Sequence, residues 1–176
     1  MSNSDDRILA LEERIEQLER TISRLTEIDA VKRVKEAYVL GADDPDHILE
    51  KMLPLVADDV EIDFGEDFGK VKGRDGFRAL LEKRKFPWTF HYMIPHAVDV
   101  SDDRQTAKGT WYLWELATMP NARTGDLEAV WIAARYDNEF AKKEGAWQIT
   151  KLKFNAQIIS PYSDGWVKTR FCELPD

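Results

Sequence analysis

The sequence predicts an α+β fold in which a curved, cone-shaped antiparallel sheet packs helices on its concave side and follows an N-terminal helical extension. Apolar residues recur at helical spacing over much of residues 8–85, whereas residues 89–158 alternate between apolar and polar side chains. The predicted strands exceed the usual ~5–6 residues, so they must twist and bend to fit a small domain. Helices followed by such a meander favour a sheet that wraps around an aromatic-rich pocket.

The N-terminal residues carry apolar side chains at alternating spacings of three and four, which is a heptad seam. The seam consists of Ile8, Leu11, Ile15, Leu18, Ile22 and Leu25. It either packs against this chain's own sheet or reaches a neighbouring subunit, and its narrow width favours the neighbouring subunit. We therefore expect a helical arm at residues 1–27, one globular domain at 28–176, and a homo-oligomer.

Cap and turn residues divide the rest of the helical part. A register change near Thr26 predicts a second helix that Thr26 caps and that Gly41 ends. Asp44-Pro45 predicts the start of another, because Asp favours the N-cap and Pro the first turn. The predicted elements are helices over 26–40, 44–53 and 73–85 and a strand over 60–64.

Four long strands should make up most of the sheet. They are predicted over 89–100, 106–118, 127–141 and 146–158. In the last of them, Trp147 and Ile149 occupy odd positions whereas Leu152 and Phe154 occupy even ones. A change of parity within one strand is what a β-bulge produces, so a bulge is expected between Ile149 and Leu152.

Composition and charge disfavour several classes of protein. A net charge of −8 argues against a nucleic-acid partner, because the basic cluster Lys83-Arg84-Lys85 is explained by the end of a predicted helix. No apolar run approaches the ~20 residues of a membrane span, so no membrane partner is expected. Cys172 is the one cysteine, and the N-terminal residues lack the pattern of a secretory signal, which together favour the cytoplasm.

Three histidines are candidates for chemistry, but His47, His91 and His96 are not spaced as a metal site. His91 lies in a largely apolar strand, where an imidazole is either a core group or a general base in a pocket. Asp43 follows Tyr38 by five residues, beyond the predicted helix end. It is either a helix cap or a carboxylate that folds back toward Tyr38.

Glu115 shares one face of its predicted strand with Trp111 and Leu113. A carboxylate on such a face lies either at a wet rim or in the interior, and in the interior it needs a partner. Arg135 on the next strand could supply that partner, as could His91.

Five groups of segments together resemble the SnoaL-like branch of the nuclear transport factor 2-like superfamily over about residues 8–158. They are Ile28–Tyr38, Leu55–Asp63, Gly73–Phe77, Thr106–Leu113, and Tyr136–Phe140 with Gly145–Trp147. The resemblance implies a cystatin-like cone. It leaves the activity open, because this superfamily includes dehydratases, isomerases, cyclases, dehydrochlorinases and non-catalytic binders.

Within the superfamily the chain most resembles bile acid 7α-dehydratases, and more distantly scytalone dehydratases and lindane dehydrochlorinases. That resemblance implies that Tyr38, Asp43 and His91 are catalytic and that Glu115 is a further pocket acid. The arginine on the last strand of those dehydratases falls at about Ala156 here, so a different substrate is expected. The C-terminal tail also differs, and we expect its Trp166 to cap the pocket mouth.

The resemblance implies a cofactor-independent dehydratase, a lyase that eliminates water from a small cyclic, steroid-like or polyketide-like hydroxy-carbonyl compound by general acid–base chemistry. An isomerase or cyclase, or a non-catalytic small-molecule-binding protein, is the alternative. No metal or organic cofactor is expected, and the oligomer should be a trimer or a dimer. The residues expected to bind the substrate are Glu115, Phe64, Phe68, Trp111, Trp131, Arg135, Phe154 and Asn155.

Overall fold

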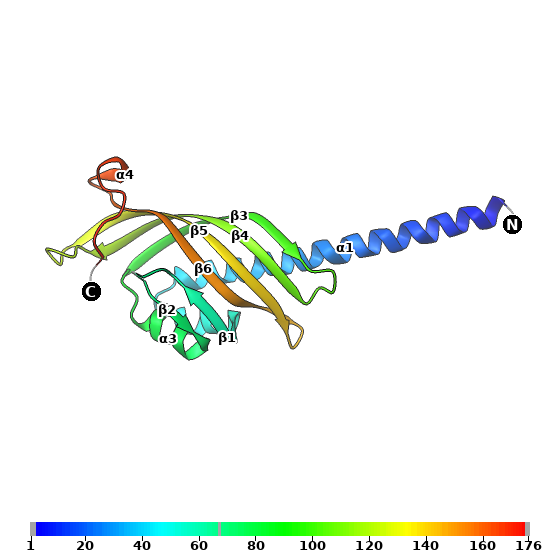
Figure 1. The fold of residues 1–176 in the computed structure, drawn as a ribbon, viewed down its shortest axis with the longest axis horizontal. Coiled ribbons are helices and arrows are strands. Elements are labelled where there is room, and N and C mark those ends of the chain that lie inside the picture. The colour runs from blue at the N-terminus through cyan, green and yellow to red at the C-terminus, as the bar shows by residue number, and fades with distance from the viewer. Residues whose placement is uncertain (1–2, 67, 175–176) are drawn as a thin grey trace.

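The computed structural model describes residues 3–66 and 68–174, and within them a six-stranded sheet carries most of its helices on one side (Figure 1). The helices are α1 (Asn3–Ala42), α2 (Ile48–Met52), the 3₁₀ helix η1 (Leu53–Leu55), α3 (Gly73–Glu82) and α4 (Gly165–Lys168). The strands are β1 (Val56–Asp63), β2 (Lys70–Lys72), β3 (Trp88–Val100), β4 (Thr106–Pro120), β5 (Leu127–Lys143) and β6 (Ala146–Pro161). The α+β class and the four long strands are as predicted.

The strands follow the order β2-β1-β6-β5-β4-β3, and the sheet stays open rather than closing into a barrel. Strands β3 to β6 form an antiparallel meander, but β1 runs parallel to β6, with Ile62 opposite Leu152. The expectation of a wholly antiparallel sheet is therefore wrong for this pair. The chain crosses the concave face through α3 after β2, begins the meander at the far edge, and returns with β6 in the direction of β1.

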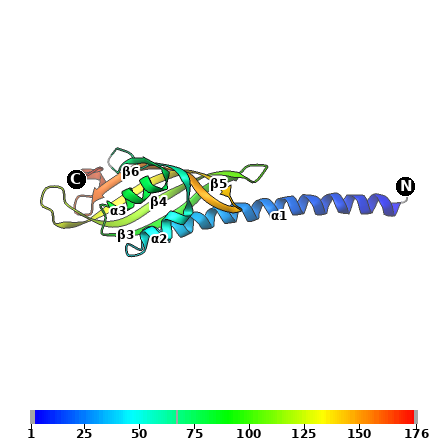
Figure 2. The same cartoon turned by 90° about the horizontal axis from the view of Figure 1, so that it is seen from below.

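Bulges bend the long strands. The β5–β6 register skips Thr150 and Gln157 on β6, so Ile149 and Leu152 both point into the core with no exposed surface. The predicted parity change is confirmed. A further register shift on β3 skips His96, and this shift sets which residues of β3 face the pocket. Figure 2 shows α2, α3 and the second half of α1 in front of the same face of the bent sheet.

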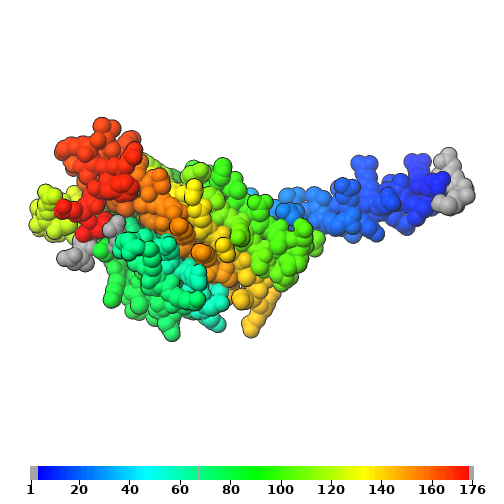
Figure 3. Space-filling model, viewed as in Figure 1, coloured from blue at the N-terminus to red at the C-terminus, as the bar shows by residue number. Residues whose placement is uncertain are grey.

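The first helix is longer than predicted, because α1 is one continuous helix through Thr26. The Thr26 hydroxyl donates to the Ile22 carbonyl 2.9 Å away, one turn back, so it does not cap a second helix. Gly41 is still helical, and its lack of a side chain has a packing role. A Cβ there would lie 2.8 Å from Met52 Cγ, so glycine lets α2 pack on the end of α1. The N-terminal part of α1 projects beyond the sheet (Figure 3).

Two other helix boundaries differ from the expectation. Asp44 does not cap a helix; its carboxylate accepts from His47 Nδ1 at 3.1 Å and from Lys51, and α2 begins only at Ile48. Helix α3 ends at Glu82, so Lys83-Arg84-Lys85 lies beyond the helix rather than in its last turn. Among the described residues, no helix combines the length and apolarity that a membrane span requires.

Candidate active site

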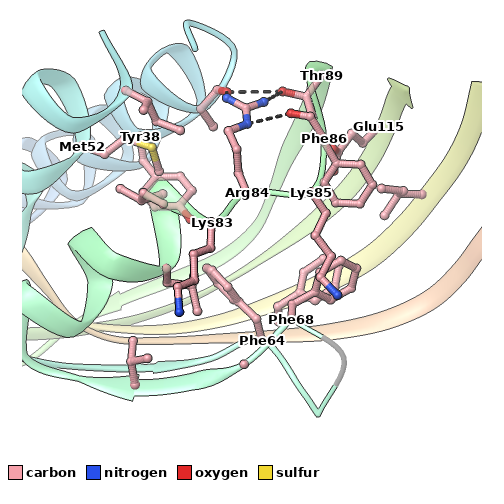
Figure 4. A pocket seen from close by; sticks show the side chains of 18 of the residues that line it. Tyr38, Met52, Phe64, Phe68, Lys83, Arg84, Lys85, Phe86, Thr89 and Glu115 are labelled. Atoms are coloured by element: carbon pink, nitrogen blue, oxygen red, sulfur yellow. Dashed lines mark hydrogen bonds between the residues drawn. The ribbon is translucent and has the colours of Figure 1, made fainter. Parts of the chain in front are cut away.

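A pocket of about 530 Å³ lies between the concave face of the sheet and the end of α1, α2 and α3. Its wall is largely apolar, and Figure 4 shows the rings of Phe64 and Phe68 converging at one side. Phe154 meets these two rings edge-to-face, with centroids 6.2 Å and 5.9 Å apart. This volume and lining suit a small, mostly apolar ligand, and the placement of these three phenylalanines agrees with the sequence-based expectation.

His91 and Asp43 meet at the polar end of this pocket. His91 Nδ1 lies 2.5 Å from Asp43 Oδ1, and the His91 backbone N–H donates to Asp43 Oδ2 at 3.0 Å. An ionised carboxylate can only accept, so Nδ1 carries a proton, and in the neutral form of the imidazole the lone pair is on Nε2. Both side chains are largely buried, with 10% and 19% of their surfaces exposed. One carboxylate thus fixes both the orientation and the tautomer of the imidazole.

The end of α1 is held against β3 by polar contacts that position Asp43. The Thr89 hydroxyl lies 3.1 Å from Asp43 Oδ1 and 3.2 Å from the Ala42 carbonyl oxygen. Arg84 reaches the same place, where its Nη1 donates to that carbonyl at 3.4 Å and its Nε donates to the Phe86 carbonyl at 2.7 Å (Figure 4). These contacts hold the last carbonyl of α1 and leave the Asp43 carboxylate aimed at His91.

Glu115 faces the other side of the imidazole, with its Oε2 3.4 Å from His91 Nε2. The two residues are directly opposite each other on β3 and β4. The pKa of Glu115 is raised to about 7, chiefly by burial and also by the Asp43 charge, whereas His91 and Arg84 oppose the rise. Glu115 is therefore protonated in a large share of molecules at neutral pH, and it can give a proton as well as accept one.

Asp43 and Arg84 have pKa values that keep both charged. Burial opposes ionisation of Asp43, but hydrogen bonds from the His91 side chain and backbone outweigh it, so the pKa of Asp43 lies below its ordinary value. Burial lowers the pKa of Arg84, and the nearby Glu115 and Asp43 charges partly offset this. The polar end thus combines a fixed carboxylate, an oriented imidazole and a carboxyl group whose pKa is about 7.

Tyr38 also lines the pocket, from the buried face of α1, and its hydroxyl is hydrogen-bonded with that of Tyr136. Burial and the neighbouring Glu115 raise the pKa of Tyr38 above its ordinary value. The phenol therefore stays protonated at every physiological pH. It can donate a hydrogen bond into the pocket but is a poor source of a transferred proton.

Lys35 lies one turn before Tyr38, with 1% of its surface exposed. Its Nζ sits 4.1 Å from the Tyr38 ring centroid and 3.9 Å from that of Tyr136. This Nζ has no hydrogen-bond partner within the described residues, and burial holds the pKa of Lys35 well below its ordinary value. The lysine thus stands behind the tyrosine pair, outside the pocket lining.

Replacing Lys35 with methionine should raise the free energy of unfolding at pH 7.5 by about 1–3 kcal/mol. The reason is that burial of the ammonium group destabilises the fold more than its contacts with the two tyrosine rings stabilise it. The lowered pKa of Lys35 costs stability below the unfolded value of 10.5, and this cost disappears as the pH rises above it. The gain should therefore be absent at pH 11. Urea denaturation measures it, with Lys32→Met as the control on the same helix. A destabilised Lys35→Met protein would show that the ring contacts dominate.

Four residues expected on the pocket wall lie elsewhere. Trp131 and Arg135 are on the convex face. Glu115 faces inward and its partner on β5 has an even number, so the even-numbered residues of β5 face inward and the odd-numbered ones face outward. Trp131 stacks on Trp114 at 5.2 Å, and Arg135 pairs with Asp137 at 2.9 Å rather than with Glu115. Asn155 also faces away from the pocket and donates to Asp137 at 2.9 Å. Their placement removes the reason for expecting them to contact a substrate.

Trp111 faces inward but belongs to the core. Its ring lies over Gly109, where a Cβ would come within 2.4 Å of it, and it packs on Phe140 with centroids 5.7 Å apart. Trp166 does not cap the pocket mouth either. It packs edge-to-face on Trp114 at 6.0 Å, on the convex side. Neither tryptophan therefore lines the pocket, because Trp111 packs in the core and Trp166 lies on α4.

Two polar residues of the site, and the lysine behind it, were missed in the sequence. Arg84 looked like a helix-end charge, and only the earlier end of α3 turns it inward. Lys35 and Tyr136 belong to apolar faces, and a lysine at an apolar helical position was the one available signal.

For a metal, the described residues contain no suitable group of three or more His, Cys, Asp and Glu side chains, because Asp43 and Glu115 occupy opposite sides of His91.

Comparison with known proteins gives one family match, and a model of the SnoaL-like domain matches residues 23–153. Among solved structures, a hexachlorocyclohexane dehydrochlorinase (LinA type 2) is 22% identical with a TM-score of 0.69, and the match covers 80% of this chain and 92% of that one. A protein assigned as a scytalone dehydratase from Novosphingobium aromaticivorans is 20% identical with a TM-score of 0.69 over 88% and 96%. LinA-type3 from Novosphingobium barchaimii is 19% identical with a TM-score of 0.69 over 89% and 99%. No curated protein matches. At these identities the solved structures show a shared fold.

Proposed function

Because the chain belongs to the SnoaL-like domain family, we propose that it is a cofactor-independent lyase that removes water from a small cyclic hydroxy-carbonyl compound. The observation that carries the proposal is the row Asp43–His91–Glu115 at the end of an apolar pocket. It combines an oriented base with an acid whose pKa is about 7. Similarity to proteins named as a dehydrochlorinase and a scytalone dehydratase adds support, since both names describe eliminations.

The first step is removal of a proton from the carbon next to the carbonyl group. His91 Nε2 takes this proton, and Asp43 stabilises the imidazolium that forms, through its contact with Nδ1. Tyr38, which stays protonated, donates a hydrogen bond to the carbonyl oxygen as negative charge develops there. A deprotonated tyrosine could not do this, so the raised pKa suits the role.

The second step is loss of the hydroxyl group from the neighbouring carbon. The electrons of the broken C–H bond form the new C=C bond, the C–O bond breaks, and the oxygen leaves as water with the proton of Glu115. His91 is then protonated and Glu115 is ionised, 3.4 Å apart. Transfer of the proton from Nε2 to Glu115 restores both groups. Because base and acid are neighbours, proton removal and departure of the hydroxyl occur on the same face of the ring.

The apolar wall provides binding and excludes water. Phe64, Phe68 and Phe154 contact the ring system, and their edge-to-face arrangement suits a flat or gently curved skeleton. We propose steroid-like or polyketide-like ketols as the substrate class, because such skeletons place a carbonyl and a hydroxyl on one rigid apolar frame.

An isomerase is the second candidate, and one observation favours it. The Tyr38 hydroxyl and the protonated form of Glu115 can both donate to one enolate oxygen, an arrangement that stabilises an enolate whether or not a leaving group follows. In that case His91 returns the proton to a different carbon, and the product has the mass of the substrate.

The test is incubation of the protein with a panel of steroid and polyketide ketols, followed by mass spectrometry. We expect loss of one water from at least one member, with no added metal or cofactor. The same panel in heavy water detects enolisation through deuterium uptake next to the carbonyl. Deuterium uptake without loss of water would favour the isomerase, and a bound ligand recovered without either change would contradict both enzymes and leave a binding protein.

A further inference from the structure

Six apolar side chains lie exposed on the projecting part of α1, and none of them belongs to the hydrophobic core or to the residues packed against it. Their exposed fractions are 52% for Ile8, 52% for Leu11, 54% for Ile15, 53% for Leu18, 62% for Ile22 and 59% for Leu25. Six large apolar residues in one stripe are more than scattered surface hydrophobics, because they form a continuous strip along the helix. We call the helical segment that carries them, residues 3–27, the arm.

The identities of the six residues specify a partner geometry. With Ile8 assigned to heptad position a, every a position of the strip is isoleucine and every d position is leucine. β-Branched residues at a with leucine at d favour a coiled coil of two parallel helices, whereas other combinations favour coiled coils of three or four helices. The strip is also narrow, as in a coiled-coil seam, and lacks the third apolar position of a core-facing helix.

The charges beside the strip point to the same partner. Arg7 and Arg14 occupy g positions, and Glu12 and Glu19 occupy e positions. When two copies lie parallel and in register, each g residue faces the following e residue of the other copy, so Arg7 meets Glu12 and Arg14 meets Glu19. An antiparallel pair would instead bring g to g and e to e, which places like charges together. Only the parallel arrangement of two identical arms is complementary.

The strip ends where the domain begins. The next a and d positions are Asp29 and Lys32, so the seam becomes polar after Leu25. From Val31 onward, α1 buries a different face from the one that carries the strip, and Tyr38 lies on this buried face. The arm can therefore bind a partner without disturbing the contacts that hold α1 against the sheet.

We propose that residues 8–25 form a parallel, two-stranded coiled coil that joins two copies of this chain. A helix without tertiary contacts is marginal in water, and most helical stability in proteins comes from packing of an apolar face. The arm has such a face, and within one copy nothing in the described structure covers it. A second arm supplies the missing packing, and the domain already holds the helix at its C-terminal end, which lowers the cost of ordering it.

The first experiment measures the mass of the full chain by sedimentation equilibrium. We expect twice the chain mass of 20.4 kDa. Leu18→Lys places a charge at a central d position and should raise the apparent dissociation constant at least ~100-fold. Leu9→Lys is the matched control, because Leu9 is 49% exposed but lies at position b, outside the seam. A trimer, or an unchanged mass for Leu18→Lys, would overturn the proposal.

The second experiment tests the charge pairing. Glu12→Arg/Glu19→Arg makes every e and g contact of the parallel homodimer repulsive, and so does Arg7→Glu/Arg14→Glu. Each double variant alone should sediment as a monomer, and an equimolar mixture of the two should form a heterodimer. Homodimers of both variants, or monomers in the mixture, would contradict the assigned heptad.

Direction is tested by a disulfide. Ile8→Cys in a Cys172→Ser background places one thiol near the start of each arm. In a parallel pair the two thiols meet at an a position, within the ~4.4–6.8 Å Cα separation that a disulfide needs. Oxidation should therefore give a covalent dimer in high yield. In an antiparallel pair Ile8 would lie opposite the far end of the strip, and only monomer would remain after oxidation.

Discussion

Replacing His91 with asparagine is expected to lower kcat/KM for any ketol that the protein dehydrates by roughly 10²–10⁴-fold, while the fold is retained. An asparagine amide can still donate to Asp43 from near the position of Nδ1, but it places no base at the position of Nε2. The loss should appear in kcat more than in KM, because the imidazole acts on the reacting atoms rather than on the apolar skeleton.

The control for His91→Asn is His96→Asn. His96 is an exposed histidine on the same strand, and its ring contacts Tyr112 on the far side of the sheet from the pocket. Asp43→Asn supplies an independent check, because an amide can donate to Nδ1 and so select the tautomer that has no lone pair on Nε2. We expect Asp43→Asn to lose activity to a similar degree. Full activity in His91→Asn would rule out the proposed base.

Replacing Glu115 with glutamine is expected to stabilise the protein at pH 8 by up to about 3 kcal/mol while it removes most of the activity. The pKa of Glu115 rises from 4.5 to about 7 on folding, and a shift of that size corresponds to about 3 kcal/mol. Because the folded pKa is the higher one, Glu115 contributes full stability below pH 4.5, and this contribution is lost as the pH rises through 7. Glutamine resembles the protonated acid at every pH.

The measurement is urea denaturation of both proteins between pH 5 and 8. The difference in free energy of unfolding should be below ~1 kcal/mol at pH 5 and should grow to its full value at pH 8. Asp43 and Lys35 also have shifted pKa values, but they are present in both proteins, so their contributions largely cancel in the difference. A difference that is constant with pH, or that shrinks as the pH rises, would contradict the buried-acid account.

Much of the architecture could be predicted because it follows from local periodicity. Alternation marks strands and spacings of three and four mark helices, so the four long strands and the arm were visible in the sequence. The bulge at Thr150 was visible for the same reason, since Ile149 and Leu152 change parity within one strand. The helix break at Thr26 was predicted wrongly, because a possible cap residue does not end a helix whose neighbouring turns stay hydrogen-bonded.

The sequence by itself determined that Asp43, His91 and Glu115 were candidates, through residue types, strand parity and resemblance to a family. Only the tertiary structure decided which of them meet. The bulge at His96 shifts the β3–β4 register by one, so His91 lies opposite Glu115; without that shift it would lie opposite Leu116, with Glu115 on the other face. A one-residue shift depends on how the whole sheet bends around α1 and α3. For that reason local pattern could not exclude Arg135 or Asn155 from the pocket, and three-dimensional packing could.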